Sequence, residues 1–80
     1  MLLPTKHISF SQSLLGLGYY LVKELDSPKT VDSLWKKYKR DVNNNYFKAR
    51  HSFDELVLAL VFLYSLGIVC EDKGVISKCV

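Results

Sequence analysis

The side chains best suited to binding a ligand are six lysines and arginines: Lys36, Lys37, Lys39, Arg40, Lys48 and Arg50. Residues 29–50 carry seven basic and two acidic residues, whereas the rest of the chain carries four basic and six acidic residues. With Tyr46 and Phe47 interleaved, this segment is suited to weak, salt-dependent contact with a nucleic-acid backbone or to an acidic protein surface. A run of lysines on one helix is equally typical of a solvated face.

The remaining polar residues are not spaced for catalysis. No serine, threonine or cysteine has a base and an orienting group at a recognisable spacing. Asp54 and Glu55 are adjacent, so they diverge on a helix, and helix capping explains them better than paired acid–base chemistry. The Gly16-x-Gly18 pair lies in a helical pattern and lacks the preceding strand that a dinucleotide site needs. We therefore expect neither enzymatic activity nor a cofactor.

Cysteine and histidine are too few for a metal centre. Cys70 and Cys79 are the only cysteines, which excludes a disulfide framework. Adding His7 and His51 gives no recognisable spacing of zinc ligands. We expect no bound metal, and we expect the cysteines to behave as small apolar side chains of a C-terminal hairpin.

Length and composition favour one small globular domain. A chain of 80 residues is too short for two domains, and 49% apolar with 24% charged residues is a globular balance. That apolar fraction is generous for so small a core, and apolar surface patches usually mark partner contacts. Met1-Leu2-Leu3 is followed at once by Pro4, without a signal-peptide core, and the apolar run 56–66 is too short to cross a bilayer. We expect a cytoplasmic protein that does not enter a membrane.

The first part of the chain predicts an arm and a helix. Residues 1–10 lack a helical period and are expected to form an extended N-terminal arm. The first helix begins at Ser11 or Ser13 and ends at Asp26-Ser27-Pro28. Its buried face holds Leu14, Leu17, Leu21 and Leu25. Gly18 falls on that face and costs about 1 kcal/mol in helix propensity, which indicates close approach of another backbone.

A second helix is capped by Thr30 and runs to about Arg40, with Trp35 as its core anchor. Its basic side chains lie on the face opposite Trp35. Residues 41–50 include Asn43-Asn44-Asn45 and have turn chemistry, so we expect a loop there.

A third helix starts with a capping box, Ser52 to Glu55, and ends at Gly67. Projected at about 100° per residue, one side faces the core with Phe53, Leu56, Val57, Leu60, Leu63 and Tyr64. The opposite side is also apolar, and a domain this small cannot bury both sides. We therefore expect Leu58, Val61 and Phe62 to bind a partner, unless the N-terminal arm or the Asn-rich loop covers them.

Two β-rich runs, residues 68–71 and 75–77, predict a hairpin, to which a segment at Lys29 can add a third strand. Three helices followed by a hairpin is the order of a winged helix-turn-helix domain. We predict an α+β, mostly helical fold of this kind over residues 1–80, with the hairpin as its wing. In DNA readers the last helix carries arginine, lysine, asparagine or glutamine, and residues 53–67 contain none of these.

Short motifs spread over nearly the whole chain carry a family resemblance. They are Leu3-Pro4-Thr5-Lys6-His7, Ser13-Leu14-Leu15-Gly16-Leu17-Gly18, Pro28 with Thr30-Val31, Leu34-Trp35, Phe53-Asp54, Leu58-Ala59-Leu60 and Leu63-Tyr64 with Leu66-Gly67. Together they resemble the small middle component of bacterial ABC three-component conflict systems, of which Lamassu anti-phage defence is the best-known kind.

The resemblance implies a non-enzymatic adaptor in a hetero-oligomer, bridging an SMC/Rad50-like ABC ATPase and an effector, often a nuclease. Contact with nucleic acid would be indirect, or weak and non-specific. The arm has no obvious structural role in a winged helix, so the resemblance strengthens the prediction that it docks on a partner through Leu3, Pro4, Lys6 and His7. The alternative is a small winged-helix DNA-binding protein or transcription regulator.

Overall fold

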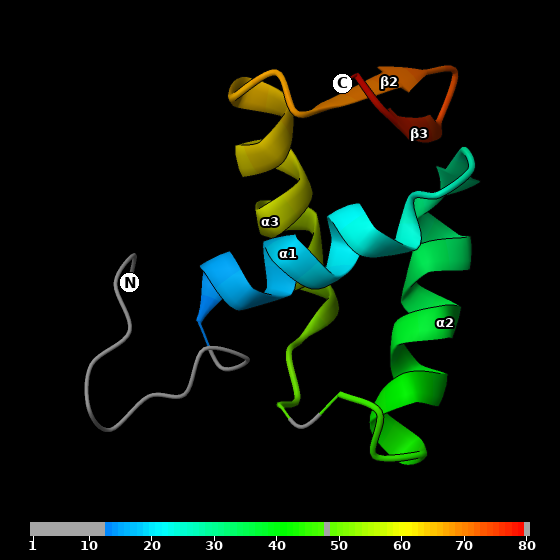
Figure 1. The fold of residues 1–80 in the computed structure, drawn as a ribbon, viewed down its shortest axis with the longest axis vertical. Helices are drawn as coiled ribbons and strands as arrows, with labels where there is room; N and C mark the ends of the chain where they lie inside the picture. The colour runs from blue at the N-terminus through cyan, green and yellow to red at the C-terminus, as the bar shows by residue number, and fades with distance from the viewer. Residues whose placement is uncertain (1–12, 48, 80) are drawn as a thin grey trace.

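The computed structural model describes residues 13–47 and 49–79. Within them lie three helices and three strands, in the order α1 (Leu14–Glu24), β1 (Lys29–Thr30), α2 (Val31–Asn43), α3 (Phe53–Ser65), β2 (Val69–Asp72) and β3 (Val75–Lys78). The helices pack on one another, and the small sheet lies across the end where α3 finishes and α2 begins (Figure 1). This α+β, winged-helix-like arrangement confirms the predicted fold class.

Helix α1 begins at the predicted cap and forms one wall of the core. The Oγ atom of Ser13 accepts a hydrogen bond of 3.0 Å from the backbone N–H of Gly16. Leu17 and Leu21 are fully buried. A Cβ atom added to Gly18 would lie 3.6 Å from Cδ2 of Leu63 on α3. The close neighbour of Gly18 is therefore a leucine side chain, and the expectation of an approaching backbone was wrong.

Helix α2 is longer than predicted. Thr30 caps it as expected, accepting a hydrogen bond of 3.1 Å from the backbone N–H of Ser33. The helix continues past Arg40 to Asn43, because Asp41 and Val42 are both buried against the rest of the domain. The predicted loop therefore starts later, after the helix has delivered these two residues to the interior.

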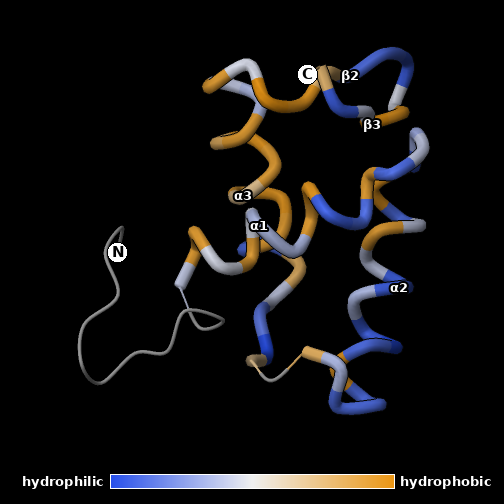
Figure 2. Tube along the Cα trace, in the orientation of Figure 1, coloured by the Kyte–Doolittle hydropathy of each residue, from blue (hydrophilic) through white to orange (hydrophobic). Residues whose placement is uncertain are grey.

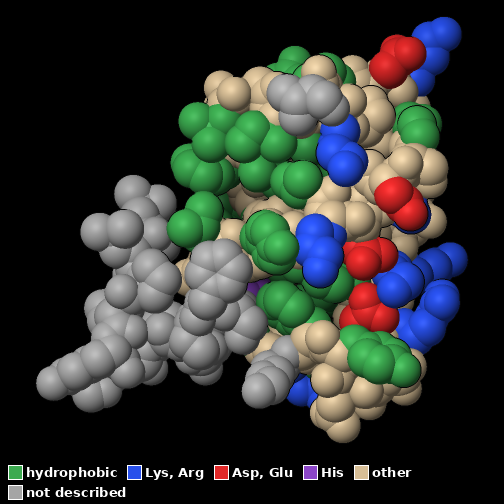
Figure 3. Space-filling model, in the orientation of Figure 1, with side chains coloured by type: hydrophobic (Ala, Val, Ile, Leu, Met, Phe, Trp, Pro, Cys, Tyr) green, Lys and Arg blue, Asp and Glu red, His purple; other side chains and the backbone are tan. Residues whose placement is uncertain are grey.

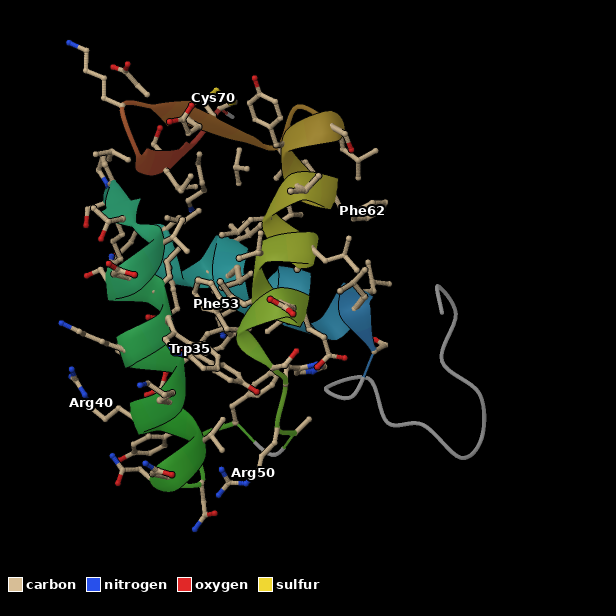
Figure 4. The ribbon with its side chains drawn as sticks, turned by 180° about the vertical axis from the view of Figure 1, so that it is seen from behind. Trp35, Arg40, Arg50, Phe53, Phe62 and Cys70 are labelled. Carbon is tan, nitrogen blue, oxygen red and sulfur yellow. A yellow bond between two sulfur atoms is a disulfide. The ribbon has the colours of Figure 1, made fainter. Side chains whose placement is uncertain are left out.

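The core anchor of α2 is not Trp35. Leu34 and Tyr38 are the most deeply buried apolar residues of this helix, whereas Trp35 is only partly buried and packs against the margin of the core. Its ring lies edge-on to Phe53 of α3, with centroids 5.5 Å apart. Trp35 thus fills the seam between α2 and α3, where Figure 4 shows it facing Phe53.

Both ends of α3 follow local signals in the sequence. Ser52 accepts a hydrogen bond of 3.1 Å from the backbone N–H of Glu55, and Glu55 accepts one of 2.8 Å from the backbone N–H of Ser52. At the other end Gly67 has a φ of 76°, which favours glycine. The N–H groups of Gly67 and Ile68 bond to the carbonyls of Tyr64 and Leu63, which is a Schellman cap.

The buried face of α3 is turned from the predicted one. Its buried residues are Leu56, Ala59, Leu60 and Leu63. Phe53 and Tyr64 are 39% and 60% exposed, so their assignment to the core was wrong. Leu63 packs against Gly18 of α1, so the face of α3 that carries Leu63 is turned toward the core. Ala59 lies on the same face and is buried with it. Figure 2 shows α3 hydrophobic along almost its whole length, so hydropathy alone could not fix its rotation.

The three strands form an antiparallel sheet in the order β1-β3-β2, so the strand at Lys29 is confirmed. Lys73 and Gly74 connect β2 and β3 with φ values of 53° and 84°. Positive φ at both central residues matches the right-handed twist of a two-residue hairpin. Val69 and Ile76 are buried and fix the sheet to the helices.

Cys70 and Cys79 are joined by a disulfide, so the expectation that they act as separate apolar side chains was wrong. Cys70 pairs in register with Ser77, which stands two residues before Cys79. The N–H of Cys79 bonds to the carbonyl of Ile68 at 3.0 Å, which extends the pairing beyond β3. The hairpin register therefore places the two Cα atoms 5.5 Å apart, a separation that a disulfide bridges readily.

Candidate functional site

The outer side of α3 carries the three apolar residues predicted to meet a partner. Leu58, Val61 and Phe62 are 54%, 56% and 36% exposed, on the side of the helix opposite its buried stripe. Figure 4 shows Phe62 pointing away from α2, on the far side of α3 from Phe53. The Asn-rich segment that follows α2 lies at the opposite end of the molecule from the sheet and leaves these side chains exposed (Figure 1).

A groove between α1 and α3 extends this surface. It has a volume of about 360 Å³ and is lined by Leu14, Leu15, Gly18, Tyr19, Val22, Phe62, Leu63 and Ile68. Leu15 and Tyr19 are exposed on the α1 side. We call the five exposed residues Leu15, Tyr19, Leu58, Val61 and Phe62 the α1–α3 apolar surface. In Figure 3 apolar side chains gather over α1 and α3, while lysines and arginines cluster at the α2 side.

Sequence reasoning missed the α1 part of this surface. Leu15 and Tyr19 are four residues apart, which places them on one face of a helix, away from the buried Leu17 and Leu21. That spacing was the available signal. The spacing alone did not show that these residues belong to the same surface as Phe62, because that depends on the packing of α1 on α3.

A partly buried polar cluster around the buried Asp41 holds α1 against α2. Tyr20 on α1 donates a hydrogen bond to Asp41, and Nζ of Lys37 lies 3.0 and 3.1 Å from the two carboxylate oxygens of Asp41. Lys37 also lies 3.6 Å from Glu24. Burial, the hydrogen bond to Asp41 and the negative charge of Asp41 raise the pKa of Tyr20 above its ordinary value. The hydrogen bond to Asp41 raises the pKa of Lys37. These groups fix the angle at which α1 presents the apolar surface.

The predicted phosphate-binding residues fall into three groups. Lys36, Lys39, Arg40 and Arg50 are exposed, whereas Lys37 belongs to the polar cluster with Asp41. Lys48 lies outside the described residues. In Figure 4 Arg40 points away from the outer side of α2, and Arg50 lies beside the C-terminal end of that helix.

Two of these basic residues share a recess. It has a volume of about 210 Å³ and is lined by Trp35, Tyr38, Lys39, Val42, Asn43, Arg50 and His51. The hydroxyl of Tyr38 donates to the carbonyl of Ala49 at 2.8 Å and accepts from the backbone N–H of His51 at 2.5 Å. These bonds tie the segment before α3 to α2. Burial raises the pKa of Tyr38, so its hydroxyl stays protonated and able to donate.

Within residues 13–47 and 49–79, no group of three histidine, cysteine, aspartate or glutamate side chains is placed to hold a metal ion. In the same part of the chain, no helix has the length and hydropathy that crossing a membrane requires.

A family model for Middle Component 6 of ABC-three component (ABC-3C) systems matches residues 3–79. The chain belongs to this family. No curated protein matches it, and neither does any solved structure. The match runs from the predicted N-terminal arm through all three helices to the end of the hairpin. The family is named for one part of a multi-component system, so this ABC-3C middle component works with the other components of such a system.

Part of the predicted contact set of this ABC-3C middle component is visible. Leu58, Val61 and Phe62 lie together on α3, and the structure adds Leu15 and Tyr19 from α1. The arm residues predicted to contact a partner, Leu3, Pro4, Lys6 and His7, lie outside the described residues. The family match begins at Leu3 and therefore includes them.

Proposed function

We propose that this chain is a non-enzymatic adaptor subunit that bridges an SMC/Rad50-like ABC ATPase and an effector, such as a nuclease, in a bacterial anti-phage defence complex of the Lamassu kind. The observation that carries the proposal is the α1–α3 apolar surface. Family membership supplies the kind of complex, and the exposed surface supplies a place where a protein partner can bind.

The apolar surface has the composition of a protein interface. Burying a large apolar side chain contributes roughly 1.5–3 kcal/mol, so these exposed residues represent binding energy that the free domain does not use. Tyr19 and Phe62 are aromatic anchors of the kind enriched at binding hot spots, and both line the groove. The groove lies between α1 and α3, which pack on one another through the core, and the Tyr20–Asp41 hydrogen bond also ties α1 to α2. Because the surface is fixed before binding, a partner loses little free energy in ordering it.

A bridge needs a second contact, and we assign it to the N-terminal arm. Leu3, Pro4, Lys6 and His7 precede α1, whose exposed side carries Leu15 and Tyr19. The arm and the apolar surface therefore belong to neighbouring parts of the chain. In this proposal DNA-end binding by the ATPase changes one of these contacts, and the effector is released or assembled through the other.

The test is co-expression with the ATPase and the effector encoded beside this chain, followed by affinity purification and size exclusion. The informative variant is Leu58→Asp combined with Phe62→Asp, compared with Tyr46→Asp, which places the same charge at an exposed aromatic residue outside the apolar surface. A chain without residues 1–10 tests the arm, and each partner is also expressed singly.

We expect the wild type and Tyr46→Asp to co-elute with both partners and the Leu58→Asp, Phe62→Asp variant to lose at least one of them. Circular dichroism and thermal unfolding establish that each variant is folded. If the wild type co-eluted with neither partner, the adaptor proposal would be refuted. Full retention of both partners by the folded double variant would instead refute the surface.

A further inference from the structure

We propose that the recess between the C-terminal half of α2 and the segment before α3 binds the phosphate backbone of a nucleic acid. We call it the Lys39–Arg50 recess; its lining is that given above, with a volume of about 210 Å³. This inference goes beyond the adaptor function, because the recess shares no residue with the α1–α3 apolar surface.

The two cations of the recess are available to a ligand. Lys39 comes from α2 and Arg50 from the segment that precedes α3, and both line the same recess. Within the described part of the chain, neither forms an ion pair. Lys37 and Lys29, in contrast, are paired with Asp41 and Asp26 at 3.0 and 2.9 Å. Two such cations that meet at one concave place have the charge that a phosphate group requires.

The side chain of Lys39 and the backbone that carries Arg50 are held in place. Nζ of Lys39 lies 5.5 Å from the centroid of the Trp35 ring, at cation–π distance. Arg50 stands between Ala49 and His51, and the backbones of both neighbours bond to the hydroxyl of Tyr38. An anion that binds here therefore orders fewer side-chain and backbone rotations than it would at a flexible lysine-rich tail.

The surroundings of Trp35 indicate the class of ligand. The Trp35 ring already stacks on Tyr38 at 5.6 Å and 19° and also carries Lys39, so protein groups occupy it instead of a nucleic-acid base. Recognition is then by phosphate and is independent of base sequence. Lys36 and Arg40 are exposed on the same helix as Lys39 and extend the positive charge by a helical turn. Further exposed cations on the helix that carries Lys39 suit a polyanion with repeated charges.

Trp35 gives this proposal a local reporter, because it is the only tryptophan of the chain and lines the recess. The experiment titrates the full chain with a mixed-sequence oligonucleotide of about 20 nucleotides, single-stranded and duplex, at several salt concentrations. The fluorescence of Trp35 reports the binding of an unlabelled oligonucleotide. In a parallel titration, the fluorescence anisotropy of a labelled oligonucleotide reports its binding to the protein. The variants are Lys39→Gln and Arg50→Gln, and Arg50→Lys retains the charge.

The matched control for each single variant is Lys73→Gln, which likewise removes one positive charge, from the exposed turn of the hairpin. We expect the wild type to bind with an affinity that falls as salt rises, and tryptophan fluorescence to change with it. The combined Lys39→Gln, Arg50→Gln variant should bind about tenfold more weakly. The plot of its log affinity against log salt should be less steep, by about one for each phosphate that the variant no longer binds. Arg50→Lys and Lys73→Gln should stay close to wild type.

Three results would overturn the inference. The first is that Lys73→Gln weakens binding as much as Lys39→Gln or Arg50→Gln alone, which would mean that only net charge matters. The second is anisotropy-detected binding without a change in Trp35 fluorescence, which would place the nucleic acid elsewhere. The third is a poly-glutamate peptide of equal charge that displaces the oligonucleotide as well as a second oligonucleotide does, which would indicate an acidic protein segment as the ligand.

Discussion

Tyr20 on α1 donates a hydrogen bond of 2.5 Å to the carboxylate of Asp41, which lies 21 residues further along the chain near the end of α2. Asp41 is buried, and its other partner is Lys37 at 3.0 and 3.1 Å. A buried carboxylate is stable only when its oxygens are bonded, so this pair fixes how α1 crosses α2.

The Tyr20–Asp41 bond predicts the effect of Tyr20→Phe. The substitution removes one donor to a buried charge while keeping the ring, so the free energy of unfolding should fall by about 1.5–3 kcal/mol. Urea denaturation measures the loss. Tyr64→Phe is the control, because Tyr64 is exposed and its change should stay within about 0.5 kcal/mol. Equal losses in the two variants would show that Asp41 does not depend on Tyr20.

The surroundings of Gly18 predict a stabilising substitution. A Cβ atom at this position would meet Leu63 at 3.6 Å, which is ordinary van der Waals contact. Gly18→Ala should therefore gain helix propensity without a clash and raise the free energy of unfolding by roughly 0.5–1 kcal/mol. Gly67→Ala should do the opposite, because Gly67 has a φ of 76°. Thermal unfolding compares the two, and a destabilised Gly18→Ala would mean that Leu63 cannot yield.

The Cys70–Cys79 bond predicts a redox-dependent stability. Closing a short loop in the unfolded chain contributes roughly 2–3 kcal/mol, so adding dithiothreitol should lower the free energy of unfolding by about that amount. Guanidinium denaturation with and without the reductant measures it. A chain with both cysteines changed to serine should be as stable as the reduced wild type and insensitive to dithiothreitol. A wild type that is equally insensitive would contradict the disulfide.

The capping box predicts a change in pH dependence. The backbone N–H of Ser52 holds the pKa of Glu55 below its ordinary value of 4.5 in the folded chain. The folded state then binds this proton less readily than the unfolded state does. The stabilisation is therefore complete above pH 4.5 and is lost as pH falls through the lowered folded-state pKa.

Glu55→Gln should make the free energy of unfolding depend less on pH below pH 4.5. At pH 7 it should lower that free energy by less than about 1 kcal/mol, because the side chain is half exposed. Urea denaturation at pH 7 and below pH 4.5 measures both effects. Asp54→Asn removes the same charge from the neighbouring residue, whose carboxylate is not the one that accepts the Ser52 N–H. If Asp54→Asn reduced the pH dependence of the free energy of unfolding as much, net charge would explain the result and the capping box would not.

The elements of the fold could be predicted because their signals are local. Ser13, Thr30 and Ser52 begin the three helices through bonds that span three residues, and Gly67 ends α3 through its own backbone. The hairpin follows from Lys73-Gly74 in the same way. The end of α2 was missed because the burial of Asp41 depends on Tyr20, far away in the sequence.

The site was predicted only in part, because its geometry depends on packing. The exposure of Leu58, Val61 and Phe62 agrees with the prediction that α3 is too apolar to be buried on all sides. Leu15 and Tyr19 join them only once α1 is placed on α3. Likewise, a count of two cysteines does not reveal a disulfide, since the register of β2 against β3 decides whether the two residues meet. Contact of any of these residues with a partner protein remains a prediction.

Helix α3 contributes to the core with one side and to the molecular surface with the other. In the proposed complex, the same helix would therefore link the supply of partners to the fate of the subunit in the cell. When this chain is made in excess, copies without a partner expose an apolar helix that chaperones and proteases recognise. We expect its abundance to follow that of its partners, so that the proportions of the complex are set by removal of unassembled copies.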